Sequence, residues 1–455
     1  MKRIVYCAMS AMLLAAFACS AGCAEKEKTP AIEIPEGYTR ENGENMFWEN
    51  EDTVKNGTVV PNVGIRIYNY APSIFEEDEN TRHAYYCSNK YTVGNDPQKG
   101  SINADGNAQI TDYIAYRKGV KLEDGNWYWS EKSYILAPLK GSETEGKHIC
   151  DPNVVKGEFA YNGETYSYLM AYLAEGFTEF VNEYNHISLA VAKSPEGPWK
   201  RCGDINPLKK YTSDEYPEEW GDRKKHPYPE TYLWGWGQAS MISADKKGRV
   251  MMAYSSIRPY AEDGVTWKQA YMTTIDRYDF SDLNNIKKEY ELTKMPITGI
   301  KRGGYQIPEV TNGDFAYEPA KNRIYMITDG RYDDTTGKAA GAPLSWIDNQ
   351  GREPGDVFNN IANGVSAPKW NTVASVLGTD RVNNIASHNT AIIRNAYGWL
   401  NDASEIEVAV TGSCVKANVF KVHPESTKND TNAMLWTYRI LRKSITIVER
   451  KEEQQ

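Results

Sequence analysis

Long apolar runs are almost missing from this 455-residue sequence. The main one extends from about Ile4 to Ala18 and is too short to span a bilayer. Clean helical periodicity is also missing from segments longer than about ten residues, which argues against a helical fold. Basic residues are fewer than acidic ones, 52 against 61, so the net charge is −9. Such an acidic chain is a poor partner for phosphate backbones, so we expect no nucleic-acid partner.

Cysteine is scarce as well, with seven residues, no CxxC pair and no Cys/His metal spacing. We therefore predict no metal site and no required cofactor. The cysteines of the main body are interpreted as buried thiols or as one or two disulfides, and their spacing does not decide the pairing. They are Cys87, Cys150, Cys202 and Cys414.

The N-terminal stretch has the layout of a secretory signal, with two basic residues, the apolar run and then small residues. The sequence SAGC before residue 24 resembles a bacterial lipobox, in which the cysteine becomes the lipidated first residue of the mature protein. We expect residues 1–22 to be removed, Cys23 to carry lipid and residues 23–56 to form a polar tether. The expected location is the cell envelope, with a lipid anchor in the outer membrane and no other membrane contact.

Five similar β-type segments recur along the rest of the chain. Each starts with a polar or small residue, runs through a short apolar stretch, turns on acidic or glycine-rich residues and returns as an aromatic-rich strand. Apolar and aromatic residues recur in them with the two-residue period of strands. The segments begin at Ala71, Asp151, Gln238, Pro308 and His388, so successive starts are 80, 87, 70 and 80 residues apart.

This repeat predicts an all-β fold, a five-bladed β-propeller with four-stranded antiparallel blades over residues 57–449, followed by a polar tail at 450–455. Four-stranded units that cannot bury both faces alone stack radially into such a propeller. The innermost strand of each blade lines a central channel, so the five segment starts should converge in one funnel. A β-sandwich also uses many short strands, but it does not explain a hairpin pattern that recurs five times.

Two stretches resemble a known enzyme family. The segment DPNVVKGEFAYNGETYSYLMAYLA and the turn SPEGPW at residues 194–199 are similar to the five-bladed glycosidases of glycoside hydrolase family 43 and its relatives in families 32, 68 and 117. The resemblance implies a glycoside hydrolase that removes arabinofuranosyl, xylosyl or galactosyl-type ends from plant or algal oligosaccharides. Relatives sometimes hold a calcium or sodium ion in the channel. We expect the chain to act as a monomer.

Glycoside hydrolysis needs two carboxyl groups, one to protonate the leaving oxygen and one to activate water or attack the sugar. By the resemblance Glu309 is the general acid, and its apolar neighbours should raise its pKa. Asp151 matches an aspartate that binds the sugar or acts as the base. His388 is a further candidate proton carrier, because some relatives use a histidine acid.

Two departures from the family pattern leave a second interpretation open. Ala71 stands where family 43 enzymes carry the aspartate base, and the third segment starts with Gln238 instead of an aspartate. The alternative is a non-catalytic carbohydrate-binding lipoprotein of a glycan-uptake system. A purely structural or protein-binding propeller would leave Asp151, Glu309 and His388 without a role.

Aromatic, amide and basic side chains complete the predicted site. Trp234 and Trp236 lead into the third segment, where their rings either stack on a sugar face or pack between blades. Gln238 is predicted to contact the substrate. Arg302 and Arg331 flank the fourth segment and either face an acidic sugar or are solvated loop arginines.

Overall fold

The computed structural model describes most of the predicted body of the protein. The described residues are 32–47, 69–89, 112–139, 141–176, 185–210, 235–261, 267–302, 305–306, 310–330, 332–333, 338–339, 341–376, 388–413 and 438–447. The predictions for residues 1–22, Cys23, most of the tether, Cys414 and the polar tail lie outside them.

The prediction of an all-β chain is confirmed. Within the described residues the helices are one α-helix, α3 (Asp356–Ala362), and a 3-10 turn, η3 (Leu283–Asn285). None of the described helices is long and apolar enough to cross a membrane. The strands are β1 (Thr39–Arg40), β2 (Asn69–Asp78), β3 (Thr81–Asn89), β4 (Asp112–Lys121), β5 (Trp127–Trp129), β6 (Ser133–Leu136), β7 (His148–Tyr161), β8 (Glu164–Glu175), β9 (Asn185–Ala192), β10 (Lys200–Arg201), β11 (Gly235–Ser243), β12 (Arg249–Ala261), β13 (Trp267–Asp279), β14 (Lys287–Leu292), β15 (Lys301–Arg302), β16 (Tyr305–Gln306), β17 (Asp314–Glu318), β18 (Arg323–Ile327), β19 (Tyr332–Asp333), β20 (Lys338–Ala339), β21 (Ala342–Asp348), β22 (Asn371–Val376), β23 (His388–Ile392), β24 (Arg394–Asn395), β25 (Glu405–Ser413) and β26 (Tyr438–Thr446).

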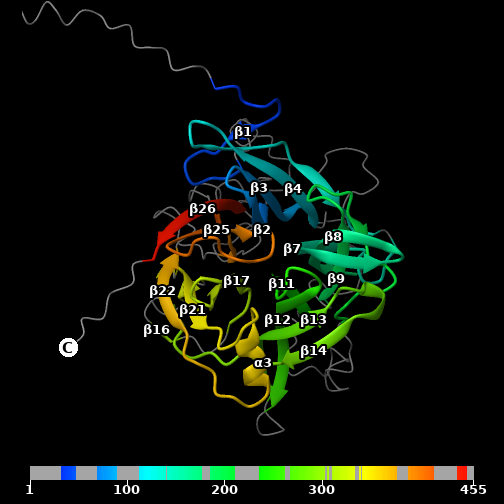
Figure 1. The fold of residues 1–455 in the computed structure, drawn as a ribbon, viewed down its shortest axis with the longest axis vertical. Coiled ribbons are helices and arrows are strands. Elements are labelled where there is room, and N and C mark those ends of the chain that lie inside the picture. Colours follow the sequence, from blue (N-terminus) through cyan, green and yellow to red (C-terminus); the bar gives the residue numbers. More distant parts are fainter. Residues whose placement is uncertain are drawn as a thin grey trace, which may run out of the picture.

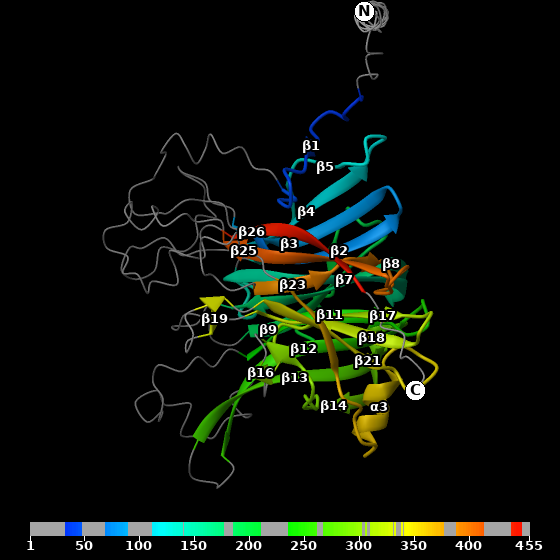
Figure 2. The ribbon, with the colours of Figure 1, turned by 90° about the vertical axis from the view of Figure 1, so that its left-hand side faces the viewer.

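Most strands belong to antiparallel ladders in which neighbours in sequence are neighbours in space. In the described part of the chain five such ladders can be followed, and we number them along the sequence. They are β2-β3-β4 with β5 and β6 at its outer edge, β7-β8-β9-β10, β11-β12-β13-β14, β17-β18-β21-β22, and β23-β25-β26. The second and third ladders belong to one sheet, because Gly235 of β11 pairs in parallel with Asn185 of β9. Figure 1 shows β2, β7, β11 and β17 near the middle of the molecule, with β4, β14, β22 and β26 further out. In the side view of Figure 2 the first strands of the ladders cross the middle of the molecule.

The apolar core is divided among the contacts between successive ladders. Tyr85 of the first ladder and Met170 of the second belong to one cluster, while Leu189 and Met252 share the next. Further clusters join the third ladder to the fourth and the fourth to the fifth. Another joins the fifth ladder to the first, through residues such as Ala409 of β25. Because each fully buried side chain contributes roughly 1.5–3 kcal/mol, these contacts hold the ladders around a common centre.

The beginning and the end of the described chain meet at the fifth ladder. The Met46 N–H donates to the Ile440 carbonyl at 3.1 Å, and the Arg442 N–H donates to the Glu44 carbonyl at 2.7 Å. The Arg442 guanidinium also binds the Glu41 carboxylate at 2.8 Å, across 401 residues of sequence. The segment 41–47 therefore continues the fifth ladder beyond β26.

Candidate functional site

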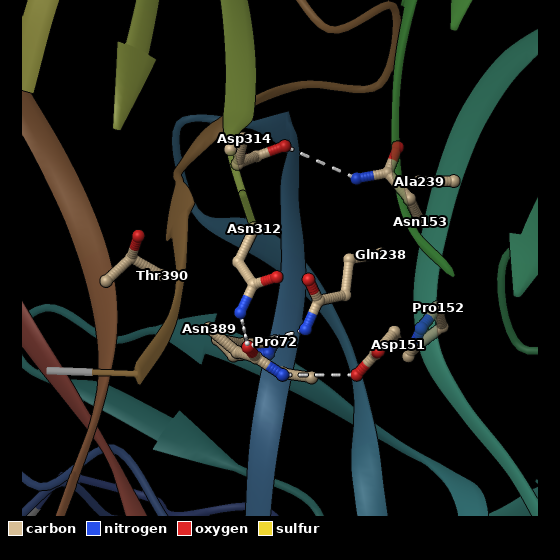
Figure 3. Close-up of a pocket in the computed structure, with 12 residues that line it drawn as sticks. Pro72, Asp151, Pro152, Asn153, Gln238, Ala239, Asn312, Asp314, Asn389 and Thr390 are labelled. Carbon is tan, nitrogen blue, oxygen red and sulfur yellow. Dashed lines mark hydrogen bonds between the residues drawn. The ribbon is translucent and has the colours of Figure 1, made fainter. Parts of the chain in front are cut away.

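The first strands of the ladders meet at a pocket that, together with the open solvent at its mouth, has an empty volume of about 330 Å³ (Figure 3). Each of the five ladders contributes lining residues, at the start of its first strand or just before it. Asp151 and Gln238, which we predicted to share a funnel, both line this pocket. The polar ends of segments that are far apart in sequence thus face one small volume.

One residue of each ladder has the same unusual backbone at the pocket. The left-handed conformation is costly for residues with a side chain, although asparagine and aspartate tolerate it best. In four of the five ladders the strand pairing is also irregular around this residue. We call these five the ring residues: Ala71 (φ 50°), Asp151 (45°), Gln238 (53°), Asn312 (55°) and Asn389 (39°).

Hydrogen bonds connect four of the ring residues (Figure 3). Asn389 Nδ2 donates to Asp151 Oδ1 at 3.2 Å. Asn389 Oδ1 accepts from Gln238 Nε2 and from Asn312 Nδ2, both at 3.0 Å. Asn389 is therefore the centre of the network and fixes the orientation of the other three side chains. Ala71 brings no polar group to it.

The backbone N–H groups of the ring residues are held by side chains of the preceding ladder. This contact occurs in four of the five ladders among the hydrogen bonds of the described residues. Each of these four contacts joins a ladder to the preceding ladder at the depth of the pocket. The pairs are Ala71 with Thr411 Oγ1 (3.3 Å), Asp151 with Cys87 Sγ (2.8 Å), Asn312 with Ser255 Oγ (2.7 Å) and Asn389 with Asp329 Oδ1 (2.8 Å).

A second carboxylate, Asp314, lines the pocket but is fully engaged. It accepts hydrogen bonds from Ser240 Oγ at 2.6 Å and from the Ile392 N–H at 2.8 Å. Arg394, only 4% exposed, forms an ion pair with it at 2.9 Å. These contacts tie the third, fourth and fifth ladders together, so Asp314 has a structural role.

The remaining predicted site residues fall in different places. Trp236 is 4% exposed and packs in the core with its ring 5.4 Å from that of Tyr254, as in the packing alternative. His388 begins β23, and Arg302 lies in β15, but their side chains are not among the described ones. Trp234, Glu309 and Arg331 lie outside the described residues, so their roles stay predictions.

The fourth segment start needs correction, whereas the fifth, at His388, coincides with the first residue of β23. β17 begins at Asp314, later than the predicted start at Pro308, and the counterpart of Asp151 there is Asn312. In the fifth ladder the counterpart of Asp151 is Asn389, the residue after His388. The ring position is defined by a left-handed backbone, which an apolar pattern does not mark. The usable signal was asparagine itself, because it is among the side-chain-bearing residues that most often adopt this conformation.

The cysteines include one disulfide, between Cys87 of β3 and Cys150 of β7, with their Cα atoms 5.1 Å apart. Cys202 is a buried thiol, and burial raises its pKa to about 12. The two disulfide sulfurs and an Asp151 oxygen lie close enough together to suggest a metal site. Because both sulfurs are bonded to one another, they are not thiolates, and this group is a poor metal ligand set.

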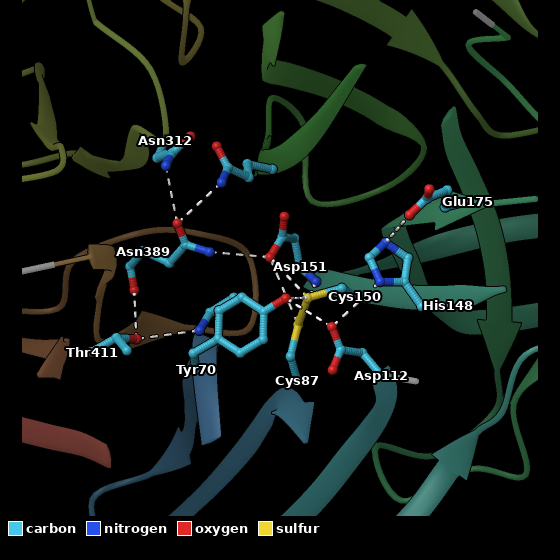
Figure 4. The surroundings of a disulfide bond; sticks show 12 residues. Tyr70, Cys87, Asp112, His148, Cys150, Asp151, Glu175, Asn312, Asn389 and Thr411 are labelled. Carbon is cyan, nitrogen blue, oxygen red and sulfur yellow. Dashed lines mark hydrogen bonds and ion pairs between the residues drawn. A yellow bond between two sulfur atoms is a disulfide. The ribbon is translucent and has the colours of Figure 1, made fainter. Parts of the chain in front are cut away.

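A charged cluster lies beside the disulfide on β7 (Figure 4). His148 Nε2 is 3.0 Å from a Glu175 oxygen, and His148 Nδ1 is 3.4 Å from Asp112. Lys147 pairs with Glu175 at 2.5 Å, and the Tyr70 hydroxyl donates to Asp112 at 3.0 Å. Burial alone would lower the pKa of His148, but the two carboxylates raise it to about 10. His148 therefore carries a positive charge at neutral pH.

No family model and no curated protein matches this chain. Among solved structures, the family 117 glycoside hydrolase Zg3597 of Zobellia galactanivorans is 12% identical and aligns over 89% of both chains with a TM-score of 0.44. A GH43_1 enzyme of Xanthomonas citri, solved with xylose, is 9% identical over 83% of this chain and 87% of that one, with a TM-score of 0.43. An endo-arabinase of Bacteroides thetaiotaomicron is 11% identical over 86% of this chain and 98% of that one, with a TM-score of 0.38. With TM-scores below 0.5, the function has to rest on the geometry of the site.

Proposed function

We propose that the chain is a five-bladed β-propeller with four-stranded blades, and that its funnel binds the end of an oligosaccharide. Five ladders, with a core cluster between each neighbouring pair, support the blade count. The segment 41–47 supplies the outer strand of the fifth blade, since it pairs with β26. The pocket then lies on the propeller axis, where ligands of such folds have room to bind.

The observation that carries the sugar proposal is the convergence of Asp151, Gln238, Asn312 and Asn389 on one pocket. Gln238 Oε1 and Thr390 Oγ1 are buried there without a hydrogen-bond partner among the described residues. Buried polar atoms are normally satisfied, so these two mark positions where a ligand supplies the missing bonds. Sugar hydroxyl groups, which both donate and accept, meet this requirement.

The reaction we assign is glycoside hydrolysis at the end of a plant or algal oligosaccharide. Asp151 acts with Glu309 as the carboxyl pair, or binds the sugar beside another base, with His388 as the second candidate proton carrier. A separation of roughly 6.5–9.5 Å between the Asp151 and Glu309 carboxyls would correspond to inversion, and about 5–5.5 Å to retention. Asp151 is 6% exposed and belongs to the ring, so its carboxylate is already positioned before the ligand arrives.

A second candidate function is sugar binding without cleavage. The observation that favours it is the composition of the ring: one alanine, three amides and a single carboxylate. Amides bind hydroxyl groups well but cannot serve as a general acid or base at neutral pH. In this case the chain is a carbohydrate-binding lipoprotein that passes glycans to an uptake system.

A panel of nitrophenyl glycosides and natural oligosaccharides separates the two candidates. Turnover by the wild type, lost in both Asp151→Asn and Glu309→Gln, is the result expected of the hydrolase. Binding by calorimetry without turnover is the result expected of the binding protein. If no sugar in the panel is bound or cleaved, the carbohydrate proposal is wrong.

The cellular location is a separate proposal. We propose that Cys23 is lipidated after residues 1–22 are removed, which anchors the protein in the outer membrane. Labelling with palmitate in cells should give a labelled wild type and an unlabelled, soluble Cys23→Ala variant. An unprocessed Met1 in intact-mass analysis would contradict this proposal.

A further inference from the structure

The disulfide between Cys87 and Cys150 adjoins the one carboxylate among the ring residues. We propose that this covalent bond positions the Asp151 carboxylate in the pocket, which makes both cysteines positioning residues. The inference deepens the proposed function and rests on it in one respect, because it takes Asp151 to contact the sugar. Whether the bridge holds the carboxylate in place is a separate question, which structures without ligand can answer.

Strand pairing alone constrains the backbone at Asp151 weakly. β7 pairs with β8, and no other described strand pairs with β7. The register of this pairing shifts between Cys150 and Asn153, which interrupts the regular ladder at the ring position. Asp151 also has a φ of 45°, and such a backbone persists only where surrounding contacts impose it. Contacts with the first ladder therefore have to help fix this residue.

The backbone hydrogen bond to the preceding ladder is weaker at Asp151 than at other ring positions. At three other ladder contacts an oxygen atom accepts the N–H of the ring residue, from Thr411, Ser255 or Asp329. At Asp151 the acceptor is Cys87 Sγ, at 2.8 Å. Sulfur is a weak acceptor, so this hydrogen bond alone holds the ring residue less firmly.

The covalent bond makes up for the weak acceptor. Cys87 is joined to Cys150, the residue just before Asp151, and both cysteines are buried. The Asp151 Oδ1 atom lies 3.1 Å from Cys150 Sγ and 3.7 Å from Cys87 Sγ, so the carboxylate rests against the bridge (Figure 4). The same oxygen accepts from Asn389 Nδ2 at 3.2 Å. One carboxylate oxygen thus contacts both the bridge and the ring network.

The bridge itself is fixed by close packing between the first two ladders. The two cysteines form a buried cluster with Tyr70, Ala71 and Leu173. The Tyr70 hydroxyl lies 2.6 Å from Cys150 Sγ and donates to Asp112 at 3.0 Å. Because protein interiors are close-packed, the bridge cannot shift without displacing these side chains. The bridge therefore ties the position of Asp151 to the first ladder.

Two double variants separate positioning from simple stabilisation. Cys87→Ser with Cys150→Ala keeps an oxygen acceptor like that of Ser255, whereas Cys87→Ala with Cys150→Ala removes the acceptor as well. Both lose the same cross-link and should lower the melting temperature similarly. Affinity for the tightest sugar of the panel should fall less than about threefold in the serine variant and at least about tenfold in the alanine variant.

Cys202→Ala is the control for the loss of a buried sulfur. Cys202 lies in the core cluster shared by the second and third ladders. Its replacement should lower the melting temperature, because it leaves a cavity, and should keep the affinity of the wild type. A fall in affinity as large as that of the alanine double variant would show that any loss of stability weakens binding, against a positioning role.

A double-mutant cycle tests whether the bridge acts through Asp151. In the Asp151→Ala background the carboxylate is gone, so removing the bridge with the alanine double variant should change affinity by less than about twofold. In the wild-type background the same change should cost at least about tenfold. An equal loss in both backgrounds would mean that the bridge does not act through the Asp151 carboxylate.

Crystal structures without ligand test the position itself. The serine variant should keep the Asp151 carboxylate within about 0.5 Å of its place in the wild type, with its hydrogen bond from Asn389 intact. In the alanine variant the carboxylate should move by about 1 Å or more and lose that hydrogen bond. An unmoved carboxylate in the alanine variant would contradict the proposal.

Failure of this inference is distinguishable from failure of the proposed function. If no sugar of the panel binds, the proposed function is wrong, and the ligand-free structures still decide whether the bridge positions Asp151. If sugars bind and the two folded double variants have equal affinities, the positioning role is wrong and the proposed function stands.

Reduction of the wild type replaces the alanine variant if that variant does not fold. Dithiothreitol opens the disulfide to two thiols and is itself oxidised to its cyclic disulfide. Sugar affinity should fall on reduction and return when oxidised glutathione, which is reduced to its thiol, restores the bond. Unchanged affinity of the fully reduced, folded protein would contradict the proposal.

Discussion

The starts of the first and second ladders are alike in backbone and different in chemistry. Ala71 and Asp151 have φ angles of 50° and 45°, each is followed by proline, and strand pairing is irregular around both. Only the second carries a carboxylate. Since the left-handed conformation persists at Ala71, where it costs about 1–2 kcal/mol and serves no polar group, the fold itself imposes it. Backbone strain here marks the architecture, and the side chain placed on it decides the function.

The largest expected effect comes from giving the start of the second ladder the residue found at the start of the first. Asp151→Ala should lower turnover, or affinity if the chain only binds, by about two or more orders of magnitude, because the only ring carboxylate is lost. The melting temperature should change little, since Ala71 shows that alanine is accepted at a ring position. Activity assays and calorimetry on the best panel sugar measure the effect. Full function in the folded variant would remove Asp151 from the site.

The reverse change gives the start of the first ladder the aspartate found at the start of the second. Ala71→Asp places a carboxylate where the family resemblance expects the base, and aspartate tolerates a positive φ better than alanine does. Turnover of a panel substrate should rise by about tenfold or more if the missing base limits the reaction. The same change in the Glu309→Gln background should give no gain. An equal gain there, or no gain in the wild type, would show that position 71 is not the base position.

The third effect is a pH dependence of the unfolding free energy, and it comes from the charged cluster next to Asp151 on β7. The pKa of His148 is raised from 6.5 to about 10 by Glu175 and Asp112, against the effect of burial. A raised folded-state pKa stabilises the protein fully below the unfolded value, and this contribution is lost as the pH rises through about 10. Denaturant unfolding of wild type and His148→Gln should therefore differ by about 2 kcal/mol near pH 6 and progressively less towards pH 10. A difference that grows with pH would contradict the charged pair.

The smallest effect concerns the contact that holds Ala71. Thr411→Val removes the acceptor of the Ala71 N–H and should cost about 1–2 kcal/mol of unfolding free energy, as for an unsatisfied buried donor. Sugar affinity should change less than about twofold, because Ala71 presents no functional group. A strong loss of affinity at unchanged stability would mean that the first ring position contributes to binding after all.

The all-β fold and the convergence of the strand starts could be predicted from the sequence, because apolar alternation and hairpin turns recur five times. Asp151 and Gln238 could be placed because each lies near the beginning of a clear strand. Asn312 and Asn389 could not, since their significance lies in a backbone angle. Trp236 shows the opposite limit: an aromatic residue beside a predicted site packs in the core, because burial depends on the facing ladder and not on the local sequence.

A crystal structure of the wild type with the tightest sugar of the panel tests the central claim most directly. The account predicts that the bound sugar lies in the pocket lined by the ring residues. Its hydroxyl or ammonium groups should donate to Asp151 and to Gln238 Oε1. It also yields the separation of the Asp151 and Glu309 carboxyls. A sugar bound elsewhere, with the ring pocket occupied by water alone, would contradict the account.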